Sequence, residues 1–254
     1  MSKTLILLRN ELKHQWLSSS TYVASVVFLV PMILFYWVII KDFSEVAKNE
    51  FPIVSFFRNF WIPNLFVVPL ITMKSIADDR RMGTLEAALT TPITPFQLVL
   101  SKFLSAYLTY LFLWCLTLSF PLLTHLMLSE GSIGGRLFSP EALGGCLVFI
   151  ALSGSCFVAI GILCSSLTRS QLVAGMLCFT GVFILIVSGR LFAEIPFGGN
   201  FSFLQSVSFN DLFHTFDHFE IFSKGVLDLR PFVFYLSASI GLLSVASIVI
   251  EQKI

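Results

Sequence analysis

The chain has 254 residues, of which 56% are hydrophobic and 12% are charged, and its net charge is +1. A soluble globular domain carries about 25% charged residues, so this composition excludes an ordinary soluble protein and indicates an integral membrane protein. The near-zero net charge provides no basic field, so no nucleic-acid partner is expected. All five cysteines lie in apolar runs, and neither a disulfide framework nor a metal site is expected from them.

Residues 3–17 precede the first long apolar run. Large apolar side chains share one helical face there, and the basic residues Arg9 and Lys13 lie elsewhere. The apolar face consists of Leu5, Leu8, Leu12 and Trp16. This pattern predicts an amphipathic helix on the inner membrane surface, in contact with membrane lipid, and a polar leader before the first span is the alternative.

Six apolar runs have approximately the length of a transmembrane helix, which needs about 20 residues. The runs are residues 21–40, 57–76, 98–123, 142–167, 172–189 and 231–250. They predict an all-α integral membrane fold with six transmembrane helices in a single domain over residues 1–254. Residues 190–230 then form a long outer loop.

The distribution of lysine and arginine predicts the orientation of these spans. With the N-terminus inside, the inner segments carry more basic than acidic residues, and the outer segments carry more acidic than basic residues. Both termini and the loops around Arg81 and Arg169 are therefore expected to be cytoplasmic, in a multi-pass protein of the cell membrane.

The outer loop has phenylalanine at every third position over residues 213–222. This spacing predicts a short amphipathic helix at the outer interface. His214 and His218 lie four residues apart with Asp217 between them, which is a weak signal for a metal site. Two histidines without a third ligand are more typical of interfacial polar residues, so no metal is expected.

Small residues recur at four-residue spacing in two of the predicted spans. They are Ala151, Ser155 and Ala159 in the fourth span, and Ser237 and Gly241 in the sixth. Small side chains allow two helices to approach closely. The pattern fits packing within the chain and dimerisation equally well.

The sequence lacks the motifs by which a membrane protein would obtain energy itself. No charged residue lies deep in a span, whereas ion-coupled carriers place ionisable groups on their pathway. The sequence also contains no phosphate-binding G-x-x-x-x-G-K-[ST] loop, no HExxH and no GxSxG. We therefore expect no enzymatic activity and no cofactor in this chain, and we expect its energy to come from a partner subunit.

The loop between the second and third spans is charged and short. Gly83 is expected to end a helix, Thr84 to cap a short helix that continues to Leu89, and Pro92 to stop it. The apolar face of this short helix consists of Leu85, Ala88 and Leu89. Residues 94–97 then read as a capping box that opens the third span. Such a helix is suited to docking into a groove of another protein, and an ordinary positive-inside loop is the alternative.

The same loop resembles the acidic, basic, Gly-Thr-Leu-Glu signature of type-2 ABC exporter permeases. The signature is Asp78-Asp79-Arg80-Arg81-Met82-Gly83-Thr84-Leu85-Glu86, followed by Leu89-Thr90-Thr91-Pro92-Ile93 and Leu100-Ser101-Lys102-Phe103. Residues 165–174 are similar to that family's turn between spans four and five, and Glu11-Leu12-Lys13 fits before span one. Residues 218–235 resemble the gliding-motility and copper-maturation branch.

The resemblance implies a six-span half-transporter that works with a second copy of itself or a related permease. Separate ABC ATPase subunits, which bind ATP and Mg²⁺, would dock on the cytoplasmic face. Residues 3–17 would be the elbow helix and residues 84–89 the coupling helix. The implied coupling residues are Asp78, Asp79, Arg80, Arg81, Gly83, Thr84, Leu85, Glu86 and Leu89, and those of the cytoplasmic turn are Thr168, Arg169 and Gln171.

Two other functions remain open from the sequence. One is half of a secondary transporter, which the uncharged spans disfavour. The other is a non-transporting membrane anchor of a motility or maturation complex. The sequence indicates export more than either alternative, and it leaves the substrate open.

Overall fold

The computed structural model describes residues 3–45, 51–84, 94–128, 140–194, 215–226 and 228–252, and these residues form helices and no strands. The helices are α1 (Lys3–Leu17), α2 (Ser19–Glu45), α3 (Pro52–Arg58), α4 (Trp61–Thr72), α5 (Ala77–Met82), α7 (Pro95–Thr117), α8 (Ser119–Leu128), α10 (Pro140–Leu167), α11 (Gln171–Glu194), α14 (Thr215–Ser223) and α15 (Leu229–Gln252). The expected all-α class is confirmed for these residues. Leu85, Glu86, Leu89 and His214 lie outside the described residues.

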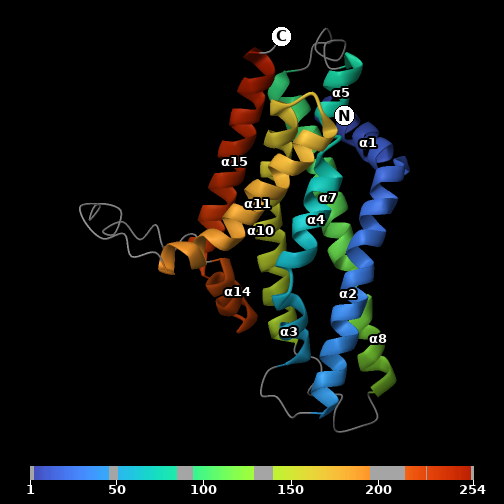
Figure 1. The fold of residues 1–254 in the computed structure, drawn as a ribbon, viewed down its shortest axis with the longest axis vertical. Coiled ribbons are helices and arrows are strands. Elements are labelled where there is room, and N and C mark those ends of the chain that lie inside the picture. The colour runs from blue at the N-terminus through green and yellow to red at the C-terminus, as the bar shows by residue number, and fades with distance from the viewer. Residues whose placement is uncertain are drawn as a thin grey trace, which may run out of the picture.

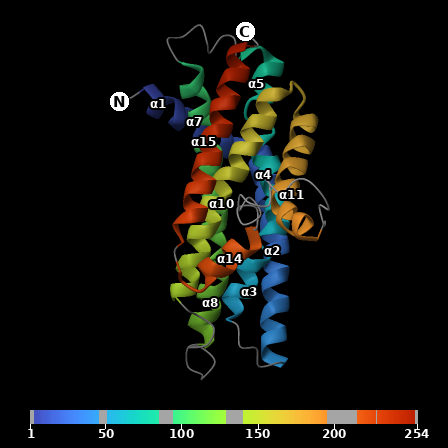
Figure 2. The same ribbon diagram turned by 90° about the vertical axis from the view of Figure 1, so that its left-hand side faces the viewer.

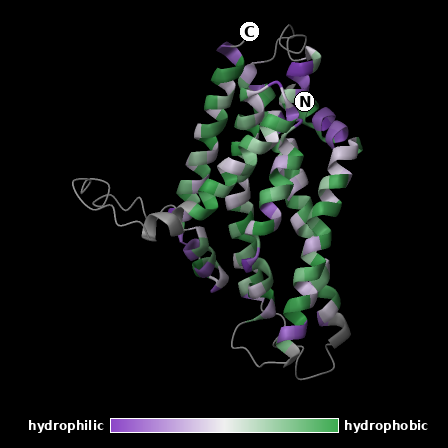
Figure 3. Ribbon diagram, viewed as in Figure 1, coloured by the Kyte–Doolittle hydropathy of each residue, from purple (hydrophilic) through white to green (hydrophobic). Residues whose placement is uncertain are grey.

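The helices form an elongated bundle around α10 (Figures 1 and 2). Helix α10 contacts α15, α11, α7, α4 and α14, which makes it the central element. The two chain ends and α5 lie at one end of the bundle, while α3 and α8 lie toward the other. Figure 3 shows hydrophobic residues along the long helices and hydrophilic ones concentrated on α5 and α1.

Four helical segments in the described residues are long and apolar enough to cross a membrane. They are Ser19–Phe43, Pro95–His125, Pro140–Leu167 and Leu229–Gln252. A fifth candidate is the pair Pro52–Arg58 and Trp61–Met82, which is bent by 48°. The remaining expected span falls on α11, whose apolar part Gln171–Val187 is shorter than these. The structure therefore supports four to five of the six expected spans.

The second expected span, residues 57–76, is not one straight helix. Helix α3 ends at Arg58 and α4 begins at Trp61, so the break falls at Asn59 and Phe60. Pro63 lies in the first turn of α4, where its missing N–H costs no hydrogen bond. The hydropathy of residues 57–76 did not reveal this break. The run is apolar throughout, and a proline in the first turn of a helix does not interrupt it.

Glycines on α10 allow its neighbours to approach closely. A Cβ at Gly154 would lie 2.1 Å from the ring of Tyr110 on α7, and one at Gly161 would lie 2.2 Å from the hydroxyl of Thr72 on α4. Real Cβ atoms do not come this close to other heavy atoms. The central position of α10 therefore depends on residues without side chains at these two crossings.

The small residues of the fourth expected span pack within the chain. The hydroxyl oxygens of Ser155 on α10 and Ser239 on α15 lie 3.0 Å apart, and Ala159 is fully buried. Tyr107 on α7 donates a hydrogen bond of 2.9 Å to the carbonyl of Ala151. On α15, by contrast, a Cβ at Gly241 would meet open space. Packing within the chain accounts for the stripe on α10, and only the stripe on α15 faces outward.

Helix α1 covers the range that the sequence predicted and lies against α7. Its inward side carries Gln15, which accepts a hydrogen bond of 2.9 Å from Ser105, and Trp16 donates one of 3.1 Å to Thr109. Leu5 is 50% exposed and Trp16 46% exposed. Hydrogen bonds thus help to attach α1 to the bundle, together with a ring contact between Trp16 and Phe112. Of the predicted apolar face, Leu8 and Leu12 are half-buried, while Leu5 and Trp16 remain exposed.

Candidate functional site

The charged loop begins as a short helix, α5. Gly83 ends α5 with a φ of 72°, in the left-handed region that favours glycine, and its N–H bonds to the carbonyl of Asp79. This confirms the predicted helix end. The Thr84 hydroxyl donates to the Asp79 carbonyl at 3.2 Å, so this side chain turns back onto α5. Past residues 85–93, the predicted capping box at the start of α7 is present, with both Thr94 and Gln97 bonded reciprocally.

Lys102 on α7 joins α5 to α1. Its Nζ lies 2.6 Å from the Asp79 carboxylate and 3.0 Å from the Glu11 carboxylate, and its side chain is only 3% exposed. A buried ammonium is tolerated when opposite charges satisfy it, and here two carboxylates share one cation. Sequence reasoning quoted Glu11 and Lys102 within its motifs but did not predict that they meet.

Asp78 joins α5 to the start of α11. The Gln171 amide donates a hydrogen bond of 2.6 Å to Asp78 Oδ1, and Arg81 forms an ion pair with the same oxygen at 3.0 Å. The Arg81 side chain is 62% exposed, so solvent weakens this ion pair. Two motifs that are far apart in sequence, the charged loop and the predicted cytoplasmic turn, therefore meet at Asp78.

Arg80 connects α5 to the end of α10. Its Nη1 donates a hydrogen bond of 2.5 Å to the carbonyl of Ser166. The C-terminal end of a helix carries partial negative charge, which favours a guanidinium there. Half-buried Arg80 thus contacts the central helix.

The neighbouring Ser165 supports the turn between α4 and α5. Its hydroxyl oxygen accepts hydrogen bonds of 3.0 Å from the backbone N–H groups of Ile76 and Ala77, and the hydroxyl donates one of 3.3 Å to the carbonyl of Met73. These backbone groups have lost their helical partners at the turn, so a buried hydroxyl replaces them.

Only part of the predicted cytoplasmic turn joins this arrangement. Gln171 does, whereas the Thr168 hydroxyl bonds locally to the Ser170 carbonyl at 3.3 Å and Arg169 is exposed. We call the connected set the charged junction. The charged junction comprises Glu11, Asp78, Asp79, Arg80, Lys102 and Gln171.

The charged junction is suited to mechanical connection rather than to bond chemistry. Its groups are tied to one another and to backbone, and they join α5 with α1, α7, α10 and α11. Breaking one partner of a buried ion pair costs about 3–5 kcal/mol, because a charge is left without compensation. The charged junction therefore ties α5 to four other helices.

The weak metal signal in the outer loop gains no support from the described residues. Among them no group of three His, Cys, Asp or Glu side chains could hold a metal ion. His218 is buried, with its Nδ1 3.5 Å from the Tyr235 hydroxyl. The helix expected there is present as α14, and Phe219 and Phe222 are fully buried.

Comparisons with known proteins bear on the whole chain. The sequence pattern of a family described as ABC-2 family transporter protein matches residues 5–237, from α1 into α15. The Escherichia coli K12 protein named probable multidrug ABC transporter permease YbhR is 27% identical to the chain over 150 residues. The similarity covers 53% of this chain and 37% of that relative, and the protein of the same name from E. coli O157:H7 gives the same values. The chain thus matches well under half the length of these relatives.

Proposed function

The chain belongs to the ABC-2 family of transporter permeases, and on that premise we propose that it forms one membrane-spanning half of an ATP-driven exporter. Permease subunits of this family are not ATPases, in agreement with the expectation for this chain. Separate ATPase subunits would bind ATP and Mg²⁺ and dock on its cytoplasmic face. The observation that carries the proposal is the connection of α5 to four helices through the charged junction.

In this proposal the six expected spans cross the membrane, with α11 as the fifth. Both termini and α5 lie on the cytoplasmic side, as the lysine and arginine distribution predicts. Their common location at one end of the bundle supports this orientation (Figure 1). Helix α1 would rest on the inner membrane surface as the elbow helix, with exposed Leu5 and Trp16 against lipid.

ATPase closure would act on the coupling segment, residues 84–89, and move α5. The Asp79–Lys102–Glu11 contacts would carry this motion to α7 and α1, and the Asp78–Gln171 contact would carry it to α11. A second copy or a related permease would complete the pathway. The name of YbhR makes drug-like small molecules the first substrate class to test.

The sequence motifs also bear on the branch of the family and on a second candidate function. We propose the gliding-motility and copper-maturation branch from the sequence resemblance of residues 218–235 alone. Membership of that branch keeps the non-transporting anchor as the second candidate function. ATP-dependent movement of a substrate in vesicles with the purified ATPase decides against the anchor.

The coupling segment is tested by comparing Leu85→Asp with Arg80→Ala in membrane insertion, co-purification of the ATPase and transport. An apolar side chain buried in a partner's groove contributes about 1.5–3 kcal/mol, and Asp there adds the cost of an unpaired charge. We expect Leu85→Asp to insert normally but to lose ATPase binding or transport more severely than Arg80→Ala. If Leu85→Asp binds the ATPase and transports like the wild type, this segment is not the coupling element.

The orientation is tested by single cysteines in a cysteine-free background. Met82→Cys and Ser170→Cys should resist a membrane-impermeant thiol reagent added to intact cells, whereas Ser44→Cys and Ser132→Cys should react. Labelling of Met82→Cys from outside would overturn the proposed topology. This experiment does not depend on the ATPase.

A further inference from the structure

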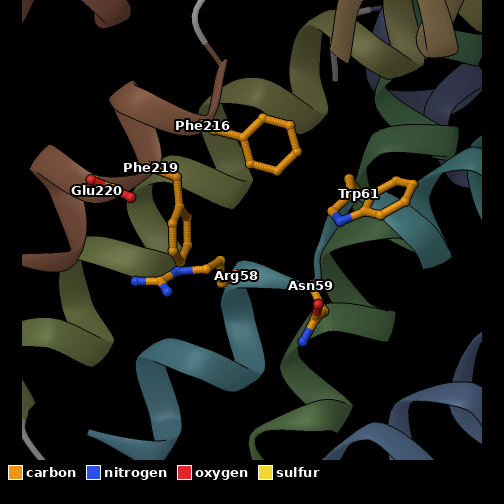
Figure 4. A pocket seen from close by; sticks show the side chains of 6 residues that line it. All are labelled: Arg58, Asn59, Trp61, Phe216, Phe219 and Glu220. Carbon is orange, nitrogen blue, oxygen red and sulfur yellow. The ribbon is translucent and has the colours of Figure 1, made fainter. Parts of the chain in front are cut away.

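A cavity of about 220 Å³ lies between the break in the second span and α14 (Figure 4). It is lined by Arg58 and Asn59 at the break, by Trp61 at the start of α4, and by Phe216, Phe219 and Glu220 on α14. Both α3 and α14 lie away from the end that carries α5 and the termini. The cavity is therefore separate from the charged junction.

The break gives the cavity a polar wall inside an otherwise apolar segment. Around it the backbone forms short-range hydrogen bonds, such as Asn59 N–H to the Phe56 carbonyl at 3.3 Å and Phe60 N–H to the Phe57 carbonyl at 3.0 Å. Non-helical backbone at membrane depth is tolerated where it is buried in protein or lines a water-filled cavity. A 48° bend that coincides with a lined cavity fits this rule.

The opposite wall is held firmly in place. The Phe219 ring stacks on Phe60 with ring centroids 5.6 Å apart and meets Phe149 edge-on at 5.5 Å. A Cβ at Gly145 of α10 would lie 1.8 Å from the Phe222 carbonyl oxygen, so α14 packs directly on the α10 backbone. Helix α14 thus presents Phe219 and Glu220 to the cavity from a fixed position.

The lining contains one side chain that suits an anion and another that suits a cation. The Arg58 guanidinium suits phosphate or carboxylate oxygens, whereas the Asn59 amide points away from it in Figure 4 and donates a hydrogen bond of 3.2 Å to the Ser55 carbonyl. The Glu220 carboxylate suits an ammonium group, while Trp61 and Phe216 add aromatic surface on the other side of the buried Phe219 (Figure 4). A drug-sized ligand occupies about 300–1,000 Å³, so this cavity has room for a headgroup-sized portion of a molecule.

We propose that this cavity binds a zwitterionic headgroup, with its anionic group at Arg58 and its ammonium group at Glu220. Such a group occurs on membrane lipids and on amphiphiles that could be transported. Binding by itself is independent of the proposed transport function, whereas movement of the bound molecule rests on it.

Binding is measured by native mass spectrometry of the full chain in an uncharged detergent. The probes are lipids with identical acyl chains and different headgroups: zwitterionic phosphatidylethanolamine, anionic phosphatidylglycerol and cationic ethyl-phosphatidylcholine. We expect phosphatidylethanolamine to bind about tenfold more tightly than the other two, because only its headgroup carries both an anionic and an ammonium group. Equal binding of the three lipids would overturn the proposal.

Variants assign the binding to the cavity. Arg58→Gln and Glu220→Gln should each weaken phosphatidylethanolamine binding about tenfold. The matched controls Arg230→Gln and Glu141→Gln remove exposed charges outside the cavity and should leave binding unchanged. A control that weakens binding as much as its cavity counterpart would contradict the assignment. If a cavity variant fails to fold, soluble glycerophosphoethanolamine is added to the wild type, and its failure to displace the lipid would equally reject headgroup recognition.

The ligand is either a transported amphiphile or a resident membrane lipid. Transport assays in vesicles that contain the permease and its ATPase distinguish the two. ATP-dependent movement of labelled phosphatidylethanolamine, reduced by Arg58→Gln, identifies a transported amphiphile. Binding without movement identifies a resident membrane lipid. Transport of other substrates without headgroup selectivity in binding would reject the cavity proposal while leaving the proposed transporter function intact.

Discussion

The end of the bundle that carries the chain termini is held together by charge, whereas the region around α3 and α14 is held together by aromatic packing. At the first, Lys102 lies between the Asp79 and Glu11 carboxylates. At the second, the rings of Phe60, Phe149 and Phe219 contact one another with centroids 5.2–5.6 Å apart. Charge-assisted hydrogen bonds weaken steeply when a distance or an angle changes, while apolar contacts depend mainly on buried area. The charged end is therefore the more sensitive to small helix movements.

The largest effect is expected from removing the cation of the charged junction. Lys102→Met leaves the Glu11 and Asp79 carboxylates, 29% and 30% exposed, without their cation, and because solvent still reaches them we expect the free energy of unfolding to fall by about 2–3 kcal/mol, less than for a fully buried charge. ATPase co-purification and coupled transport should fall with it. Thermal unfolding in detergent and both assays measure these effects. Lys13→Met, which removes an exposed lysine of α1, is the control, and equal behaviour of the two variants would show that the ion pairs hold nothing together.

A smaller effect, on stability alone, is expected at the aromatic end. Phe219→Leu keeps an apolar side chain but loses ring contacts, so we expect a loss of about 1–2 kcal/mol. The number of substrate molecules moved per ATP should stay unchanged, because no contact to α5 is altered. Thermal unfolding and the transport-to-hydrolysis ratio are the measurements, with Phe96→Ala, an exposed phenylalanine, as control. A lowered ratio would mean that both ends take part in coupling.

The smallest effect is expected from the exposed ion pair of the charged loop. Arg81→Ala removes the contact to Asp78, which should cost about 0–1 kcal/mol because water screens it. The Gln171–Asp78 hydrogen bond remains and keeps α5 beside α11. We expect near wild-type stability and a slight loss of ATPase binding at most. A loss comparable to that of Lys102→Met would indicate that Arg81 contacts the partner directly.

Local signals in the sequence predicted local structure well. Gly83 ends a helix and Thr94 opens one because each acts within a few residues of itself, through a left-handed turn and a capping box. The helix α1 follows instead from large apolar side chains repeated at helical spacing. These features were therefore accessible from residue type and spacing.

The long-range contacts were not accessible in this way. Nothing in the spacing of Glu11, Asp79 and Lys102 states that they meet, because their encounter depends on how three helices pack. Nor did the apolar run over residues 57–76 reveal the break at Asn59, since hydropathy measures transfer to lipid and not helix direction. A lysine early in an apolar span was the one available sign of a buried ion pair.

Ser165 links α5 to the central helix α10, so a force applied to α5 acts on α10. It receives the first amides of α5 at 3.0 Å, and the adjacent Ser166 carbonyl receives Arg80 at 2.5 Å. Two consecutive residues of α10 therefore hold α5 at both its beginning and its middle. These hydrogen bonds tie α5 to the last turn of α10, although more than eighty residues separate the two in the chain. A push on the loop after α5 therefore acts directly on α10 at the axis of the bundle, and through the Ser165–Met73 hydrogen bond it also acts on the end of α4.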